Sequence, residues 1–243
     1  MRQVIAQTKN LHNLAEVGQA LSTRTPDLPG IGLIWGPAGH GKTTAAAWFR
    51  DRTDAVYVRA QALWTPSGML SAICRELDIM PAARCSLMLD TIVERLATTQ
   101  RLLIVDEADY LLRSGRLLDT LRDLHDVSSA PVIVIGMADF RRRVASREQF
   151  AGRIAQTVEF RAADLDDVRV TAEACCEVEL ADDLVERITR ETQGSMRRVK
   201  VALSVIESWA DRRGCKRVSL AEWGDQPIDG TVGAGRKPTG GGR

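Results

Sequence analysis

A glycine-rich segment that ends in a lysine and a threonine is the part of the sequence best suited to chemistry. It consists of Gly36, Pro37, Ala38, Gly39, His40, Gly41, Lys42 and Thr43, followed by Thr44, and it fits the pattern GxxxxGK[ST]. Backbone N–H groups of such a turn converge on a phosphate, and a following helix N-terminus adds positive potential. Lys42 would reach the β- and γ-phosphates, and the Thr43 hydroxyl would ligate Mg²⁺. The pattern predicts a binding site for ATP and Mg²⁺.

A pair of carboxylates follows an apolar run later in the chain. Residues 101–105 lead directly into Asp106 and Glu107. Because strands of an open parallel sheet end at the ligand crevice, both side chains should lie near the phosphate loop. Asp106 would hold Mg²⁺ through its water shell, and Glu107 would polarise a water for attack on the γ-phosphate. The adjacent glutamate favours hydrolysis over passive nucleotide binding.

The elements around these motifs predict an α/β fold. An apolar strand at 31–35 precedes the loop, and residues 44–50 form a helix after it. Strands and helices alternate through the first two thirds of the chain, which predicts a parallel sheet with helices on its faces. Further strands are expected at 55–59, 101–106, 131–136 and 156–160. Further helices are expected at 10–21, 66–77, 87–96, 111–124 and 140–150.

The pattern changes after Asp164. Only helical segments follow, near 165–176, 181–192 and 195–213, and the last stretch is rich in glycine and proline. We expect an α/β core at 1–162, a small helical lid at 163–224 and a disordered tail at 225–243.

Composition agrees with a compact ATPase. Charged residues make up 27% of the 243 residues and the net charge is +1, so any surface that binds nucleic acid must be local. Five cysteines show no CxxC spacing, and no apolar run approaches the length of a membrane span. We expect a soluble, cytoplasmic protein that does not contact a membrane.

These motifs together resemble those of the AAA+ ATPases. The shared features are a phosphate loop, an Asp-Glu pair after the third strand and a helical lid. The resemblance implies a five-stranded parallel sheet in the order 5-1-4-3-2. In the lid, residues 194–198 look like the sensor-2 signature. The resemblance implies that Arg197, with Arg198 beside it, reaches the γ-phosphate. The alternative is a helix start with two solvated arginines.

A closer resemblance is to the regulators of DNA transposition, the target-DNA-binding ATPases of Mu-like phages and related transposons. The lead-in at 7–11 and the run Asp106-Glu107-Ala108-Asp109 carry it. It implies that Asn10 contributes to nucleotide binding. It also implies a homo-oligomer, as ring or filament, that binds double-stranded DNA and a transposase and hydrolyses ATP slowly, with stimulation by DNA or a partner.

The wider resemblance also predicts residues that complete the site. An arginine finger from a neighbouring subunit would stabilise charge on the γ-phosphate, and Arg153 matches its position, with Arg147 second. The run 141–143 fits a solvated or DNA-facing surface better. The polar sensor-1 residue expected after the fourth strand is replaced by Met137, so either Asp139 substitutes or hydrolysis is slow.

DNA contacts and other functions stay open in the sequence. In the related ATPases the DNA-facing elements follow the second strand, which here points to Arg59, Thr65 and Ser67 as phosphate contacts, although each is equally well an ordinary loop residue. One alternative is an AAA+ ATPase of a secretion or cell-envelope system that does not act on DNA. Another is a small-molecule kinase, which the Asp106–Glu107 pair and the separate helical segment disfavour.

Overall fold

The computed structural model describes residues 1–25 and 27–229, and the chain divides into two compact units. The core unit is Lys9–Arg161. The helical unit combines Met1–Thr8 with the chain from Ala162 onward. The sequence placed residues 1–8 with the core, whereas here they belong to the helical unit.

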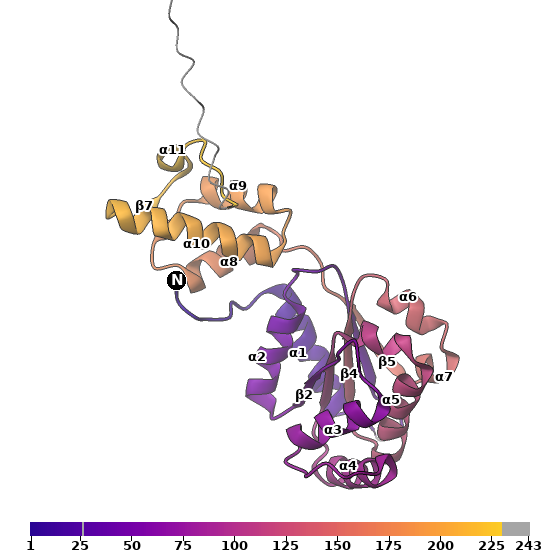
Figure 1. Ribbon diagram of the computed structural model, residues 1–243. Coiled ribbons are helices and arrows are strands. Elements are labelled where there is room, and N and C mark those ends of the chain that lie inside the picture. Colours follow the sequence, from indigo (N-terminus) through magenta and orange to yellow (C-terminus); the bar gives the residue numbers. More distant parts are fainter. Residues whose placement is uncertain (26, 230–243) are drawn as a thin grey trace, which may run out of the picture. The chain divides into compact units, whose positions relative to one another are not determined.

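The core unit is built on a parallel sheet (Figure 1). It has five strands in the order β2-β3-β4-β1-β5. This confirms the predicted order, because it is the same order counted from the other edge. Its strands are β1 (Ile31–Trp35), β2 (Val56–Arg59), β3 (Leu103–Asp106), β4 (Val132–Gly136) and β5 (Ile154–Glu159). β1 and β3 are both internal strands, separated only by β4. Because the strands are parallel, the loops that follow β1 and β3 lie at the same carboxyl-terminal end of the sheet.

Helices cover both faces of this sheet, as expected for strands joined by helical crossovers. Gly32 of β1 lies against Val17 and Leu21 of the first helix, which places that helix on one face. The core helices are α1 (Lys9–Ser22), α2 (Lys42–Thr53), α3 (Pro66–Glu76), α4 (Cys85–Thr99), the 3₁₀ helix η1 (Ala108–Arg113), α5 (Gly115–Ser128), α6 (Phe140–Ala145) and α7 (Glu148–Ala151). The single helix predicted over 140–150 is thus two short helices.

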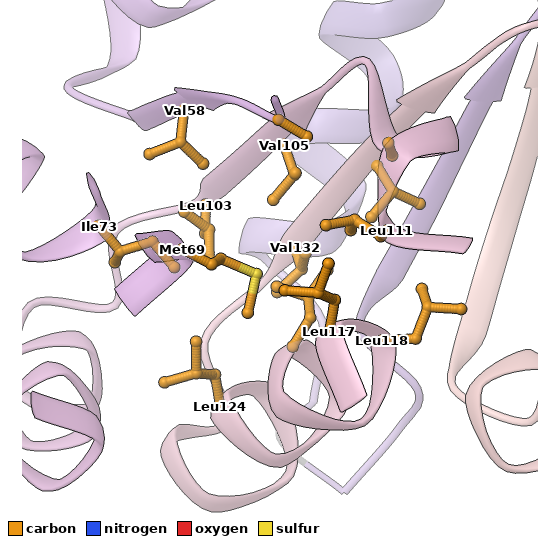
Figure 2. Close-up of a cluster of buried hydrophobic side chains, with 14 of the residues drawn as sticks. Val58, Met69, Ile73, Leu103, Val105, Leu111, Leu117, Leu118, Leu124 and Val132 are labelled. Atoms are coloured by element: carbon orange, nitrogen blue, oxygen red, sulfur yellow. The ribbon is translucent and has the colours of Figure 1, made fainter. Parts of the chain in front are cut away.

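The opposite face carries the main hydrophobic cluster (Figure 2). Alternate residues of the strands, such as Leu103 and Val105 of β3, point into it and meet side chains from α3, η1 and α5. Met69, Ile73, Leu111 and Leu117 are among these and are fully buried. Because side chains alternate along a strand, the same register sends Asp106 to the other face, away from this cluster.

Three longer helices dominate the helical unit. They are α8 (Leu165–Cys175), α9 (Asp182–Thr192) and α10 (Met196–Arg213), close to the predicted segments. The unit also contains a short parallel pair, β6 (Glu179–Leu180) with β7 (Arg217–Val218), and a last turn of helix, α11 (Leu220–Trp223). The residue pattern after Asp164 predicts only helices, because two-residue strands carry no periodic signal.

The end of the described chain is packed rather than free. Arg187 donates to the carbonyls of Gly224 and Gln226, Trp223 Nε1 donates to Gln226 O, and Ile228 is buried in the helical unit. The prediction of a disordered tail from residue 225 is therefore wrong for 225–228. The part of that prediction that covers residues 230–243 lies outside the described residues. Within the described chain, none of the helices combines the length and apolar character needed to cross a bilayer.

Candidate nucleotide site

The glycine-rich loop joins β1 to the first turn of α2. Lys42 begins α2, and its buried ammonium donates to the carbonyls of Gly36, at 2.6 Å, and Pro37, at 2.8 Å. These bonds fold the lysine back over its own loop, where it can meet phosphate oxygens. Gly41, immediately before the helix, has φ 88°, and Gly39 has φ 83°. Both are left-handed values that glycine adopts readily, so the loop turns sharply into the helix N-terminus.

Gly36 explains why this loop needs a glycine at its start. Its φ is 153°, and a Cβ added there would lie 2.5 Å from the carbonyl oxygen of Phe160. Phe160 follows β5, and its carbonyl oxygen also contacts His40, whose Nδ1 lies 3.2 Å from it. The loop is therefore held from outside by the chain that follows β5.

The Asp106 carboxylate at the end of β3 lies next to Thr43. The Thr43 hydroxyl donates to Asp106 Oδ2 at 2.8 Å, although the two residues are far apart in sequence. Asp106 is 2% exposed, and its Oδ1 accepts the backbone N–H of Glu107 at 2.8 Å. A hydroxyl beside a carboxylate is a donor set that suits Mg²⁺, so these residues fit the ion that the sequence implies.

Tyr57 also belongs to this site, although it lies in neither of the two sequence motifs. Its hydroxyl donates to Asp106 Oδ2 at 2.9 Å. Burial, and next the negative charge of Asp106, raise the pKa of Tyr57 far above its usual range, so the phenol stays protonated and remains a donor. The available signal was the alternation Val56-Tyr57-Val58-Arg59, which puts Tyr57 and Arg59 on one face of β2.

Glu107 leaves β3 in a left-handed conformation, with φ 54°. Its Oε1 lies 3.0 Å from a terminal nitrogen of Arg59, the last residue of β2. Arg59 pairs with Asp106 in the register of the two strands, so the ion pair crosses the end of the sheet. The residue proposed as the water activator is thus tethered by a residue that the sequence proposed for DNA contact.

The loop after β4 is tied to the carboxylate motif by Asp109. Its Oδ2 accepts the backbone N–H of Met137 at 2.7 Å, and Arg143 lies 4.0 Å from its Oδ1. Burial raises the pKa of Asp109 above its usual value. Asp139, proposed as a substitute for the polar sensor residue, instead lies exposed and pairs with Arg142 at 3.3 Å.

The remaining candidates lie at exposed positions, as Thr65 and Arg147 do, or at half-buried ones, as Ser67 and Arg153 do. Thr65 is the N-cap of α3, where its Oγ1 accepts from Gly68 N, and Ser67 lies in the first turn of that helix. Arg153 lies just before β5 and is held by Asp126, with its terminal nitrogen 2.9 Å from Oδ2. Arg147, the second finger candidate, is exposed before α7.

Asn10 and Arg198 are held by hydrogen bonds to the main chain, whereas Arg197 is exposed. Asn10 exchanges two hydrogen bonds with the main chain of Arg161: its Nδ2 donates to the carbonyl at 2.8 Å, and its Oδ1 accepts from the N–H at 3.1 Å. In the helical unit, Arg198 donates to the carbonyl of Glu191 at 2.8 Å, and so caps α9. Arg197 is exposed in the first turn of α10. Of the two arginines, Arg197 is thus better placed to contact a ligand.

Comparison with known proteins agrees with this geometry. The family model described as an AAA domain matches residues 25–144, which include the phosphate loop and the carboxylates. A search of curated proteins found no match.

Solved structures share the fold at low sequence identity. The Orc1 protein of Aeropyrum pernix, solved in complex with DNA, is 22% identical with a TM-score of 0.61, over 89% of this chain and 63% of that one. Cdc6p of Pyrobaculum aerophilum is 18% identical with a TM-score of 0.63, and the match covers 89% of this chain and 66% of that one. The third structure is a signal transduction ATPase with numerous domains and a tetratricopeptide repeat sensor, from Pyrococcus horikoshii. It is 14% identical with a TM-score of 0.54, and the match covers 83% of this chain and 30% of that one.

This chain therefore spans somewhat less than two thirds of the length of the first two structures. The family match and the arrangement of Lys42, Thr43 and Asp106 around one loop lead to the same assignment. The chain contains an AAA-type P-loop ATPase domain.

Proposed function

We propose that this protein binds and hydrolyses Mg²⁺·ATP, and that its ATP-bound form assembles as a homo-oligomer on double-stranded DNA. The observation that carries the ATPase part is the hydrogen bond between Thr43 and Asp106, with Glu107 next in the chain. Bound Mg²⁺ would neutralise charge on the β- and γ-phosphates. Thr43 and Asp106 would hold it, Lys42 would bind the phosphate oxygens, and Glu107 would orient and deprotonate the attacking water.

The DNA part rests on two supports. The A. pernix Orc1 protein, which shares this fold, was solved in complex with DNA. The chain also carries exposed arginines in α6, at positions 141, 142 and 143, which offer positive charge to phosphates although the net charge is only +1. Arg59, Thr65 and Ser67 remain proposed DNA contacts, and Asn10 and Arg197 remain proposed nucleotide contacts.

For its biological role we propose regulation of DNA transposition through contact with a transposase. This role is supported by the resemblance of residues 7–11 and of the Asp106–Asp109 motif to the transposition regulators. Arg153 would complete the ATP site of a neighbouring subunit, and the partial exposure of its side chain just before β5 is compatible with that.

The test measures nucleotide and DNA binding in the same preparation. Binding of a fluorescent ATP analogue and of a labelled duplex of arbitrary sequence is followed for the wild type and for Lys42→Ala, with Lys200→Ala, an exposed lysine of α10, as the matched control. We expect ATP-dependent duplex binding that weakens steeply with salt in the wild type and control, and neither binding activity in Lys42→Ala. Duplex binding that is absent in every nucleotide state would remove DNA from the proposal and favour an ATPase that acts elsewhere. Micromolar ATP affinity in Lys42→Ala would remove the site itself.

A further inference from the structure

The Asp106 carboxylate receives hydrogen bonds from three different segments of the core unit. Oδ2 accepts the hydroxyls of Thr43, at 2.8 Å, and Tyr57, at 2.9 Å, and Oδ1 accepts the Glu107 N–H at 2.8 Å. Thr43 and Glu107 belong to the two sequence motifs of the site. Tyr57 belongs to neither, and it comes from the edge strand β2.

We propose that Tyr57 is a positioning residue for the Mg²⁺ ion, which acts by fixing the orientation of the Asp106 carboxylate. The inference rests on the proposed binding of Mg²⁺·ATP. An ionised carboxylate has two acceptor directions on each oxygen. Thr43 and Tyr57 occupy both acceptor directions of Oδ2, and the Glu107 N–H occupies one direction of Oδ1. Among the described residues, this leaves the second direction of Oδ1 to accept a hydrogen bond from a water in the metal's hydration shell.

Thr43 alone cannot provide this orientation. Its hydroxyl has one hydrogen, which it gives to Asp106, and its oxygen is needed as the direct Mg²⁺ ligand. The Glu107 N–H holds Oδ1, and the Tyr57 hydroxyl is the donor on Oδ2 that does not touch the metal, so together these two donors oppose rotation of the carboxylate about its Cβ–Cγ bond. Partners of this kind orient metal ligands in proteins generally, and their loss weakens metal binding.

The Tyr57 ring is itself well held. Tyr57 pairs with Ile104 in the register of β2 and β3, two residues before the pair formed by Arg59 and Asp106. The Arg50 guanidinium of α2 lies 5.7 Å from its ring centroid. The hydroxyl therefore approaches Asp106 from a strand, and the half-buried ring has a guanidinium of α2 beside it.

The experiment measures how nucleotide binding depends on Mg²⁺ in the full chain. Tyr57→Phe keeps the ring and removes only the hydroxyl. We expect it to raise the Mg²⁺ concentration needed for half-maximal tight binding of a fluorescent ATP analogue by about tenfold, the scale found for lost partners of metal ligands. Affinity for the analogue in EDTA and the thermal midpoint without ligand should stay near wild type. Tyr110→Phe, which changes the chain's other tyrosine, is the matched control and should leave the Mg²⁺ dependence unchanged.

A double-mutant cycle with Asp106→Asn separates positioning from a general structural effect. If Tyr57 acts through the carboxylate, adding Tyr57→Phe to Asp106→Asn should change the Mg²⁺ dependence much less than it does in the wild type. An unchanged Mg²⁺ dependence in Tyr57→Phe, or an equal loss of affinity with and without Mg²⁺, would overturn the inference while leaving the ATPase proposal intact. A wild type that binds no nucleotide under either condition would instead overturn the proposed function.

Discussion

Arg59 and Glu107 form an ion pair of 3.0 Å across the ends of β2 and β3. The pair joins the residue proposed to activate water to a residue whose side chain is 60% exposed. While Arg59 donates to Oε1, one acceptor direction of that oxygen is occupied and the Glu107 side chain is held toward the end of β2. Because pairs this exposed contribute only about 0–1 kcal/mol, the pair can break at little cost.

Arg59→Ala should therefore raise ATP hydrolysis in the absence of DNA, by up to about fivefold, since this is the rate equivalent of an ion pair of that strength. Steady-state phosphate release with saturating Mg²⁺·ATP measures it. Arg75→Ala, which removes an exposed arginine from α3, is the control. A lower rate in Arg59→Ala would mean that the pair holds Glu107 in its productive position rather than away from it.

Glu107→Gln should separate nucleotide binding from turnover. The amide keeps the size of the side chain and an oxygen that can face Arg59, but it cannot accept the proton of the attacking water. We expect ATP to bind within a fewfold of the wild-type affinity while turnover falls by about 10²-fold or more, and complexes with DNA to last longer. Undiminished turnover would exclude Glu107 as the base and leave Asp109 as the next candidate, although Asp109 already accepts the Met137 N–H.

Arg153→Ala tests whether the active site is shared between subunits. We expect near-normal ATP binding by the isolated subunit but lower hydrolysis and weaker assembly on DNA, because the finger would serve a neighbour's site. Mixing Arg153→Ala with Glu107→Gln subunits should restore part of the activity, since some interfaces then pair an intact finger with an intact base.

The Arg153 experiment has its own control in the same ion pair. Asp126→Asn weakens the contact that holds Arg153 in the subunit but keeps the arginine, so it should retain hydrolysis. Absence of recovery at every mixing ratio, in samples where mixed oligomers are demonstrated, would transfer the finger role to Arg147.

Asn10→Ala should destabilise the core unit. The change removes both hydrogen bonds to the Arg161 main chain and leaves a partly buried N–H and C=O without them, which costs about 1–3 kcal/mol. Urea unfolding measures the loss, with Asn13→Ala in the same helix as the control, expected within about 0.5 kcal/mol of wild type. Reduced ATP affinity at full stability would instead favour the nucleotide-binding role proposed from the sequence resemblance.

Local patterns were sufficient to predict most of the elements. The apolar run at 31–35, the glycines after it and the helix formers that follow specify a strand, a loop and a helix without help from the rest of the chain. The alternation of strands and helices predicted a parallel sheet, and the resemblance to AAA+ ATPases supplied its strand order, which the structure confirms. Residues 225–228 were misassigned because a composition rich in glycine and proline does not reveal that Arg187 and Trp223 bind that segment.

Contacts between distant segments were decided only by the tertiary structure. The hydroxyl of Tyr57 meets Asp106, and Asn10 meets Arg161, over separations of 49 and 151 residues. Sequence periodicity shows which face of an element a side chain occupies, but not which residue of a neighbouring element it meets. The sequence by itself therefore determined the chemistry of the phosphate loop and the carboxylates. The pairing of β2 with β3, set by strand register, decided which side chains orient those carboxylates.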